Sequence, residues 1–496
     1  MKKRIILTSV IAALTAGLTS CNMDLRPYGT IEPDNALQTI DDASRLRLGL
    51  YYFFRAYSGG VFVNRDEIRS DLYHATAGFG NNGGNVYNFI LSAQDGEPSN
   101  IWGGAYQTIS NANFFIEKAD AVNTEEWSQA DRESLNVWKG EAYFLRAYYY
   151  MELVKYFCGS DPSSYGVPYV TLYRPTSNRG DYPSRGTLEA TYQNIASDLD
   201  SARKYVTTAG SVGSAYITAD AVTALKARFA LISGDYATAI TEASSLIDPG
   251  KYRLISDVDT LTNMWVNDSG TECILQLDAS YPNELGTSYD MGYIGYNSAQ
   301  QIYNPSYVPE QWVLDLYDPT DIRYQVYFRR QTTQGSGGAN YDLTLLYKFP
   351  GNPDLRGGES DQNYQHKPKV LRIAEMYLIR AEAMMRAGTG DPMADINALR
   401  TARIPGYTGS ASSDVQTEIL NERVRELIGE GFRMQDLRRF GVDLQRRAAQ
   451  NSASIYLPGT NQDFYVSYQD GRMIFPIPQS ELDANPQMAG QQNPGY

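Results

Sequence analysis

The residue types that most often carry catalysis are scarce in this sequence or stand at unsuitable spacing. It contains two histidines, His74 and His366, and neither belongs to a His-Glu-x-x-His pair of metal ligands. It has no Gly-x-Ser-x-Gly nucleophile turn and no phosphate-binding loop that ends in Gly-Lys-Ser/Thr. We therefore expect a binding protein, not an enzyme, and one that uses no metal and no cofactor.

Two short motifs resemble ligand sites but lack the context that such sites need. Residues 78–83 satisfy Gly-x-Gly-x-x-Gly, yet no apolar strand precedes them and no helix follows, so a mobile loop is the better interpretation. Asp257 and Asp259 resemble the start of a calcium loop, but Thr262 stands where the turn needs glycine and Met264 where the ion needs an oxygen ligand. The sequence therefore predicts neither a dinucleotide site nor a calcium site.

Tyrosine is the side chain that this sequence concentrates, with 39 in the whole chain. Eleven lie in one segment, mixed irregularly with Asn, Gln, Gly and Asp: Tyr281, Tyr289, Tyr293, Tyr296, Tyr303, Tyr307, Tyr317, Tyr324, Tyr327, Tyr341 and Tyr347. No helical or strand period would bury them all, so we expect some on exposed loops, where binding residues are common. Flat rings beside amide and carboxylate groups suit sugars or extended peptides. The alternative is that these rings cover a helical scaffold.

Two loop-rich segments, 58–100 and 281–347, combine such rings with oriented polar groups. In the second segment, Tyr289, Tyr293 and Tyr296 are spaced closely enough to line one wall of a site. The predicted ligand-binding residues of both segments are Asp66, Arg69, Asp71, Tyr73, Tyr87, Tyr281, Tyr289, Tyr293 and Tyr296.

Charge and cysteine content restrict the class of partner. The formal net charge is -14, which argues against nucleic acid and against anionic lipid surfaces as partners. Apart from Cys21, the chain has only Cys158 and Cys273, too few for a disulfide framework at this length. We expect these two to be separate and mostly buried; a disulfide between them is the alternative.

The first 21 residues have the pattern of a bacterial lipoprotein signal. Lys2, Lys3 and Arg4 form a basic start, an apolar run extends to Leu18, and Leu-Thr-Ser then precedes Cys21. The run is too short to span a membrane, and no other stretch approaches the roughly 20 apolar residues that a spanning helix needs. We predict cleavage before Cys21, lipidation of its sulfur, and a soluble body on a membrane tether. The alternative is an ordinary signal peptide with an incidental cysteine.

The elements that position the tyrosine-rich segments are mostly helices. Apolar residues recur at three- and four-residue spacing, with Thr187 and Thr218 at predicted starts and Gly159, Gly234 and Gly250 at predicted ends. Residues 56–100 read as loops, 251–349 as short strands and turns, and the tail after Asn451 as extended. The predicted helices cover residues 35–55, 102–120, 128–157, 187–206, 218–233, 236–247, 370–386, 393–402, 414–429 and 434–440.

An internal repeat indicates helical hairpins. Residues 141–147 and 375–381 share the form Glu-x-Tyr-apolar-apolar-Arg-Ala, and Lys226-Ala227 begins a weaker third copy. Ala227 lies seven residues before Gly234, and Ala381 lies seven before Gly388. A small residue at a helix crossing, then a glycine turn and a second helix, is typical of tetratricopeptide-like hairpins. We expect these hairpins to form one scaffold with the loop-rich segments laid over it.

Ordered motifs along the chain carry a resemblance to a known family. They include Tyr192-x-x-Ile195-x-x-Asp198-Leu199-x-x-Ala202 and Ala224-Leu225-Lys226-Ala227-Arg228, together with the two repeat copies. The others are Trp102-x-x-x-Tyr106-x-x-Ile109-x-x-Ala112-Asn113, Glu422-Arg423-x-x-Glu426-Leu427-x-x-Glu430-Gly431-x-Arg433-x-x-Asp436-Leu437-x-Arg439, and an ending with Ile477-Pro478 and Asn493-Pro494-Gly495-Tyr496. With its lipoprotein signal, the chain resembles the SusD/RagB family of surface nutrient-binding lipoproteins.

The resemblance implies a fold and a partner. The fold is mainly α: a SusD-like scaffold of tetratricopeptide-like helical hairpins, overlaid by loop-rich, partly β ligand-binding segments. The partner is a SusC-like TonB-dependent barrel in the cell outer membrane, which a lipid-anchored protein of this family covers as a lid facing the cell exterior. Glu422, Glu426 and Glu430 share one helix face, and we expect Arg423, Arg433 and Arg439 to neutralise them in a scaffold charge network.

The predicted organisation has five parts, and three functions compete. Residues 1–20 are the signal peptide, 21–33 the linker, 34–280 the N-terminal helical region, 281–364 the ligand-binding segment, and 365–496 the C-terminal helical region and tail. The first function is capture of oligosaccharides for the barrel. The second is the same role for oligopeptides, since residues 303–312 resemble a segment of RagB-type peptide binders. The third, a surface hydrolase, has no motif to support it.

Overall fold

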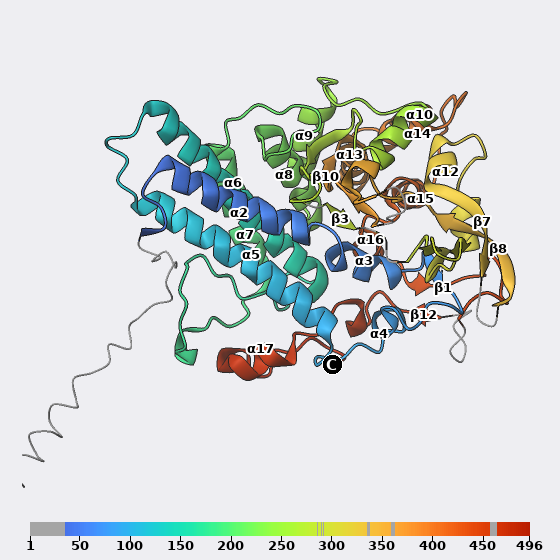
Figure 1. Ribbon diagram of the computed structural model, residues 1–496, viewed down its shortest axis with the longest axis horizontal. Coiled ribbons are helices and arrows are strands. Elements are labelled where there is room, and N and C mark those ends of the chain that lie inside the picture. Colours follow the sequence, from blue (N-terminus) through green and yellow to red (C-terminus); the bar gives the residue numbers. More distant parts are fainter. Residues whose placement is uncertain are drawn as a thin grey trace, which may run out of the picture.

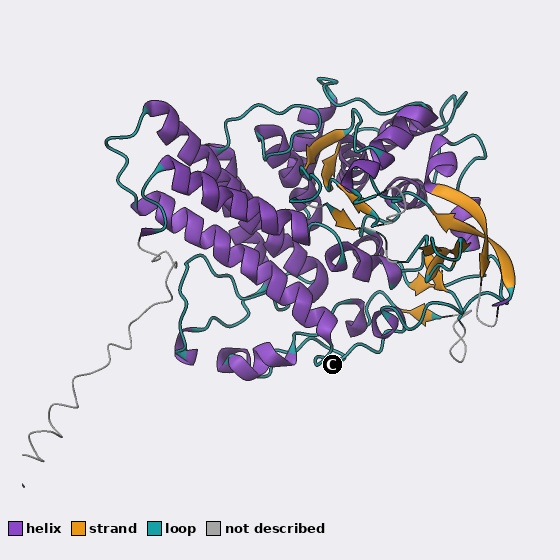
Figure 2. Ribbon diagram, viewed as in Figure 1, coloured by secondary structure: helices purple, strands orange, loops and turns teal. Residues whose placement is uncertain are grey.

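The protein is described from a computed structural model, whose described residues are 35–284, 286–288, 290, 292–334, 338–358, 363–456 and 464–496. Long helices fill one side of the molecule, and small sheets gather on the other side (Figure 1, Figure 2). Within these ranges no helix is both long and apolar enough to cross a membrane. The predicted lipidation site Cys21 lies outside the described residues.

The long helices form the scaffold that the sequence predicts, with ends that lie within six residues of the predicted ones. Thr39 begins the first of them with a capping box, its side chain and that of Asp42 each accepting a backbone N–H of the other. The helices of this group, which lie side by side in Figure 1, are α2 (Ile40–Tyr57), α5 (Gly96–Ala121), α6 (Gln129–Phe157) and α7 (Leu188–Tyr205).

The second group of helices contains the other repeat copies. Gly234 and Gly388 end the first helix of two hairpins in the left-handed conformation, with φ of +86° and +64°, which glycine adopts without steric cost. These helices are α8 (Ala219–Ser233), α9 (Tyr236–Ile247), α13 (Ile373–Ala387), α14 (Pro392–Arg403), α15 (Val415–Leu427) and α16 (Arg433–Phe440). The predicted mainly α, hairpin-based fold is confirmed.

The arginine of the repeat joins the two helices of a hairpin. Arg146 of α6 binds Asp198 of α7 through both carboxylate oxygens, at 2.8 and 2.5 Å. Arg380 of α13 binds Asp395 of α14 in the same two-pronged way, at 2.9 and 2.7 Å. The repeated Arg-Ala pair therefore marks two equivalent hairpins, each closed by a bidentate ion pair.

The glutamate of the repeat joins each hairpin to a helix from an earlier part of the chain. Glu141 of α6 accepts from Arg47 of α2, at 2.5 and 2.7 Å. Glu375 of α13 accepts from Arg228 of α8, at 2.6 Å to each oxygen. The repeat thus encodes the stacking between neighbouring units as well as the closure of each hairpin.

The segment predicted as loop between residues 56 and 100 contains regular structure. It forms α3 (Val61–Ile68), β1 (Tyr73–Ala75) and α4 (Gly84–Tyr87). The period of α3 was hidden because its buried side includes polar residues as well as Phe62 and Ile68. Among them, Glu67 accepts the backbone N–H groups of Gly429 and Gly431, which fastens α3 to the end of α15. The prediction of a loop there was wrong.

A four-stranded sheet with the order β4-β5-β7-β8 lies at the side of the molecule away from the long helices (Figure 1). β5 pairs in parallel with β7, and the other neighbours are antiparallel. Its strands are β4 (Tyr296–Asn297), β5 (Ile302–Tyr303), β7 (Phe328–Gln334) and β8 (Asn340–Leu346).

Two-stranded sheets and short helices connect the scaffold to this sheet. The predicted strand at Cys273 is present and pairs with a strand that replaces the first turn of the helix predicted at 370. The paired strands are β1 with β6 (Tyr307–Pro309), β2 (Cys273–Gln276) with β10 (Lys369–Arg372), β3 (Thr287–Ser288) with β9 (Gln365–His366), and β11 (Leu444–Gln445) with β12 (Tyr465–Val466). The remaining helices are α10 (Val258–Val266), α11 (Gln311–Asp315), α12 (Ile322–Tyr327) and α17 (Gln479–Ala484). Cys158 and Cys273 are buried and unpaired with each other, as expected.

Candidate ligand-binding site

The five residues predicted in the first loop segment lie in the interior. Each is at most 3% exposed. Asp71 receives a bidentate ion pair from Arg433 of α16, at 2.7 Å to each oxygen. Since α3 and the strand after it pack under the C-terminal helices, these side chains are covered by protein. The residues concerned are Asp66, Arg69, Asp71, Tyr73 and Tyr87.

The aromatic and guanidinium groups of this first segment pack against one another. Arg69 lies between the rings of Phe89 and Phe475, at 5.0 and 4.9 Å from their centroids. Arg446 lies 3.6 Å from the centre of the Tyr87 ring. Such stacking stabilises buried guanidinium groups. The expectation that this segment offers these side chains to a ligand at the surface is therefore wrong.

The four tyrosines predicted in the second segment have different environments. Tyr281 is half exposed, Tyr296 is partly exposed, and Tyr293 is buried with its ring stacked 5.0 Å from that of Tyr73. Tyr289 lies outside the described residues. The predicted wall of Tyr289, Tyr293 and Tyr296 therefore does not form as a unit, because Tyr293 points into the core while Tyr296 lies on the four-stranded sheet.

The sheet brings other tyrosines beside Tyr296. Tyr296 on β4 is opposite Tyr303 on β5, and their ring centroids are 4.9 Å apart. Tyr303 is in turn opposite Thr333 on β7, and Thr333 is opposite Tyr341 on β8. Directly opposed residues share one face of a sheet. We call the set Tyr296, Tyr303 and Tyr341 the tyrosine row; all three rings are partly exposed.

Further groups extend the tyrosine row along the same region. Tyr347 continues the alternation that includes Tyr341, and the guanidinium of the exposed Arg329 lies 5.0 Å from its ring centre. The Tyr364 hydroxyl accepts the backbone N–H of Tyr296 at 3.1 Å. Burial raises the pKa of Tyr303, and it raises the pKa of Tyr364 to about 12. These hydroxyls are therefore neutral near pH 7 and can both donate and accept hydrogen bonds.

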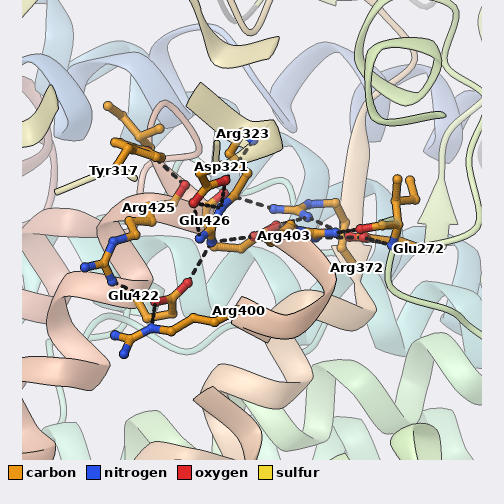
Figure 3. A network of polar contacts seen from close by, with 12 residues as sticks. Glu272, Tyr317, Asp321, Arg323, Arg372, Arg400, Arg403, Glu422, Arg425 and Glu426 are labelled. Atoms are coloured by element: carbon orange, nitrogen blue, oxygen red, sulfur yellow. Dashed lines mark hydrogen bonds and ion pairs between the residues drawn. The ribbon is translucent and has the colours of Figure 1, made fainter. Parts of the chain in front are cut away.

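Buried charge holds the start of β7 in place. Arg323 of α12, the helix that leads directly into β7, is fully buried and binds Asp321, Glu422 and Glu426 at 2.7–3.1 Å (Figure 3). Burial alone would raise the pKa of Glu422, but Arg323, Arg425 and Arg400 outweigh it and hold that pKa at about 2. The carboxylate is therefore ionised at every physiological pH and fixes α12 against α15.

A second buried cation holds the end of β8. Lys348 follows this strand and donates to the backbone oxygens of Glu426 and Ile428, at 3.1 and 3.0 Å, and to the Glu430 carboxylate at 2.7 Å. Burial lowers the pKa of Lys348 to about 8, although Glu430 opposes this shift. The β7–β8 hairpin, which contributes Tyr341, is thus clamped at its base to the end of α15.

The predicted charge network is confirmed for Glu422 and Glu426 of α15, but Glu430 lies beyond the end of that helix at Leu427, and the arginine partners differ. Arg403 and Arg372 each lie 3.0 Å from Glu426, and Arg400 lies 2.7 Å from Glu422 (Figure 3). The arginines predicted as partners bind elsewhere: Arg423 to Asp436, Arg433 to Asp71, and Arg439 to Glu382 and Asp436. A residue next to a glutamate on a helix is turned about 100° away from it, so Arg423 reaches α16 instead.

The tyrosine row and the neighbouring Arg329 together offer ring faces, neutral hydroxyls and one exposed guanidinium. Such a set can stack on apolar faces and hydrogen-bond to polar edges of an oligomeric ligand. Among the described residues, no three His, Cys, Asp or Glu side chains are grouped so that they could hold a metal ion. Tyr303, Tyr341 and Tyr347 belong to the tyrosine-rich segment but were not among the predicted ligand-binding residues, and Tyr364 lies outside that segment. The alternation Tyr341-x-Leu343-x-Leu345-x-Tyr347 was the available signal that Tyr341 and Tyr347 face the same way.

Two family profiles match this chain. The profile described as "SusD family" matches residues 275–496, and the one described as "Starch-binding associating with outer membrane" matches residues 61–231. The SusD-like protein P2 of Formosa agariphila is 24% identical over 538 aligned positions, covering 100% of both chains. The starch-binding protein SusD of Bacteroides thetaiotaomicron is 35% identical over 172 residues, which cover 34% of this chain and 28% of that protein.

Solved structures share the fold. A SusD superfamily protein from Bacteroides thetaiotaomicron superposes with a TM-score of 0.77 at 26% identity, covering 92% of this chain and 100% of that one. The surface glycan-binding protein A from Bacteroides fluxus superposes with a TM-score of 0.69 at 19% identity, covering 93% and 100%. The second likeness concerns the fold alone.

Proposed function

Because this chain belongs to the SusD family, we propose that it is a lipid-anchored outer-membrane protein that captures oligosaccharides without chemically changing them. It delivers them to a SusC-like TonB-dependent barrel. The observation that supports this proposal best is the tyrosine row, three partly exposed rings placed in register across a clamped sheet. Flat rings with neutral hydroxyls match the alternating apolar faces and hydroxyl edges of a pyranose chain.

Oligopeptide capture is the second candidate, and the structure favours it less. The segment on which it depends, residues 303–312, places Tyr307 and Val308 in the core. Its Trp312 is partly buried, and the guanidinium of Arg447 lies 4.3 Å from the ring centre. Of this segment, Tyr303 is the residue that takes part in the tyrosine row. The role of the segment is therefore chiefly to support the sheet.

The ligand class can be tested on soluble protein that begins after Cys21. The protein is applied to an array of neutral and acidic oligosaccharides and, in parallel, to a library of extended peptides. We expect retention on neutral oligosaccharides and none on peptides. Retention on peptides alone would establish the second candidate, and release of shortened sugars from the array would contradict a role without catalysis.

The partner can be tested by purification from membranes at native expression in mild detergent. We expect a large TonB-dependent barrel to copurify with the protein, since lid and transporter must stay together to pass on a ligand. An interface of the size that permanent complexes bury would survive this treatment. Recovery of the protein alone, with intact lipid and fold, would contradict the lid model.

A further inference from the structure

A groove lies between the end of α6 and the C-terminal tail. It encloses about 740 Å³ and is lined by the turn after α6, by residues 468–474 and by Pro494. None of its lining residues belongs to the tyrosine row. Two of them, Tyr165 and Tyr468, are 43% and 36% exposed, which makes them large aromatic surfaces within one groove.

The Tyr165 ring is held from one side by a buried cation. Arg185 is 4% exposed, and its guanidinium lies 5.1 Å from the centre of the Tyr165 ring. Arg185 is fixed in turn by donating to the backbone oxygens of Gly166 and Gln491, at 2.7 and 2.8 Å. Because its support cannot shift, the ring presents its exposed part to the groove at little entropic cost on binding.

The Tyr468 ring is held in a comparable way. It packs against Gly441, the left-handed residue that ends α16, where an added Cβ would lie 3.7 Å from the ring. The backbone N–H of Tyr468 donates to Asp443 at 2.9 Å, and its hydroxyl accepts from the Gln469 amide at 3.1 Å. Both aromatic surfaces of the groove are therefore positioned before any ligand arrives.

Two charged groups that line the groove have protein partners. Both oxygens of Asp470 bind Arg472, at 3.0 and 2.7 Å. The two terminal nitrogens of Arg438 donate to the backbone oxygens of Lys155 and Cys158, at 2.6 and 2.9 Å. The buried side chains of Met473 and Ile474 contribute apolar lining. A groove with two supported rings, in which Asp470 is paired with Arg472 and Arg438 is bound to backbone oxygens, suits a neutral ligand that has apolar faces and hydroxyl edges.

We propose that this groove is a second binding site for a neutral oligosaccharide, separate from the tyrosine row. The two sites lie on different elements, so each can hold its own segment of a long glycan. Occupation of both by one chain raises the overall affinity above that of either site alone, because the second contact becomes intramolecular.

The test compares two sets of substitutions on an array of neutral oligosaccharides. The row variant carries Tyr296→Ala, Tyr303→Ala and Tyr341→Ala, and the groove variant carries Tyr165→Ala and Tyr468→Ala. We expect the row variant to keep weak retention, and addition of the groove substitutions to reduce it at least tenfold further. Tyr165→Phe with Tyr468→Phe should restore that retention, because the rings remain. Tyr52→Ala, on an exposed α2 side chain, is the matched control.

The outcomes separate this proposal from the function of the tyrosine row. If the groove variant is retained like the wild type, and the row variant is not retained at all, the second site is overturned while the first stands. If the groove substitutions lower retention neither in the wild type nor in the row variant, the second site is likewise overturned. Absence of any retention by wild type overturns both. Hydrogen exchange on the wild type gives a readout without substitution: the array glycan that the wild type retains most strongly should protect amides in 159–165 and 468–474.

Discussion

At the scale of single residues, Tyr303 has the central position in the proposed site. It pairs with Tyr296 on one side and with Thr333 on the other, and its ring rests on the buried cluster of Val308, Leu343 and Leu345. A partly exposed ring that rests on a buried apolar cluster is suited to stacking on a ligand. We therefore expect oligosaccharide binding to depend on the Tyr303 ring more than on its hydroxyl.

Tyr303→Ala should weaken oligosaccharide binding about 5- to 150-fold, which corresponds to ~1–3 kcal/mol for the loss of one stacking platform. Tyr303→Phe should retain most of the affinity. The measurement is a titration with the array glycan that the wild type retains most strongly. Equal losses for Ala and Phe would show that the hydroxyl, and not the ring, carries the contact.

Asp71 was predicted to contact the ligand, but in the structure it forms a buried ion pair with Arg433. Asp71→Asn leaves the buried Arg433 guanidinium without its counter-charge, and breaking a buried pair from one side costs about 3–5 kcal/mol. We expect urea denaturation to show a loss of this size in the free energy of unfolding, with unchanged glycan affinity in the folded protein. Glu126→Gln, at an exposed position, is the control. Weaker binding by a fully stable Asp71→Asn protein would return Asp71 to the site.

The sequence showed which segments are rich in aromatic residues, but not which of those residues are buried and which are exposed. Tyr293 and Tyr296 are three residues apart and differ in exposure. Tyr293 is buried and stacks on Tyr73, whereas Tyr296 is partly exposed and belongs to the four-stranded sheet. Strands of two residues, such as β4 and β5, carry no period that a sequence could reveal. The register that aligns the tyrosine row depends on contacts between segments far apart in the chain.

At the scale of elements, the helices were predictable and the positions of their charged partners were not. Caps such as Thr39 and Thr187, and ends such as Gly234, mark helix bounds locally. The buried partners of α15 come instead from α12, α14 and β10, which only the tertiary fold brings together. The clamp on the β7–β8 hairpin is therefore a property of the structure that the Glu422 motif alone could not specify.

The ion pairs of Glu422, which hold α12 against α15, predict that the stability of the protein depends on pH in the acid range. Since the folded pKa of Glu422 is about 2, below the usual value for glutamate, its ion pairs contribute stability that is fully present above the unfolded pKa. That contribution is lost as the pH falls from about 4.5 towards 2. Melting temperatures across this range should fall steeply for the wild type and less steeply for Glu422→Gln, which is already destabilised at pH 7. Parallel curves for the two proteins would contradict the role of Glu422.

At the scale of the whole molecule, the repeat explains why a helical scaffold can present a small sheet rigidly. Arg146 and Arg380 close equivalent hairpins, and Glu141 and Glu375 join these hairpins to α2 and α8. The chain thus builds one continuous support from a short repeated motif. The tyrosine row and the groove lie on elements added to this support.

The proposed membrane anchor of the whole chain depends on one residue. Cys21→Ala should give protein that is no longer labelled by palmitate and no longer fractionates with the outer membrane, because a single modified sulfur carries the acyl chains. The measurement is metabolic labelling followed by membrane fractionation. Persistent outer-membrane fractionation that requires detergent for release would mean that another feature provides the anchor.

The central claim, that the tyrosine row binds oligosaccharide without a metal or cofactor, is tested most directly by calorimetric titration in buffer containing EDTA. The titrant is the neutral array glycan that the wild type retains most strongly. The wild type should bind in EDTA as it does without it, and the triple variant Tyr296→Ala, Tyr303→Ala and Tyr341→Ala should lose at least tenfold in affinity while melting at a similar temperature. Unchanged affinity in a folded triple variant, or loss of wild-type binding in EDTA, would contradict the claim.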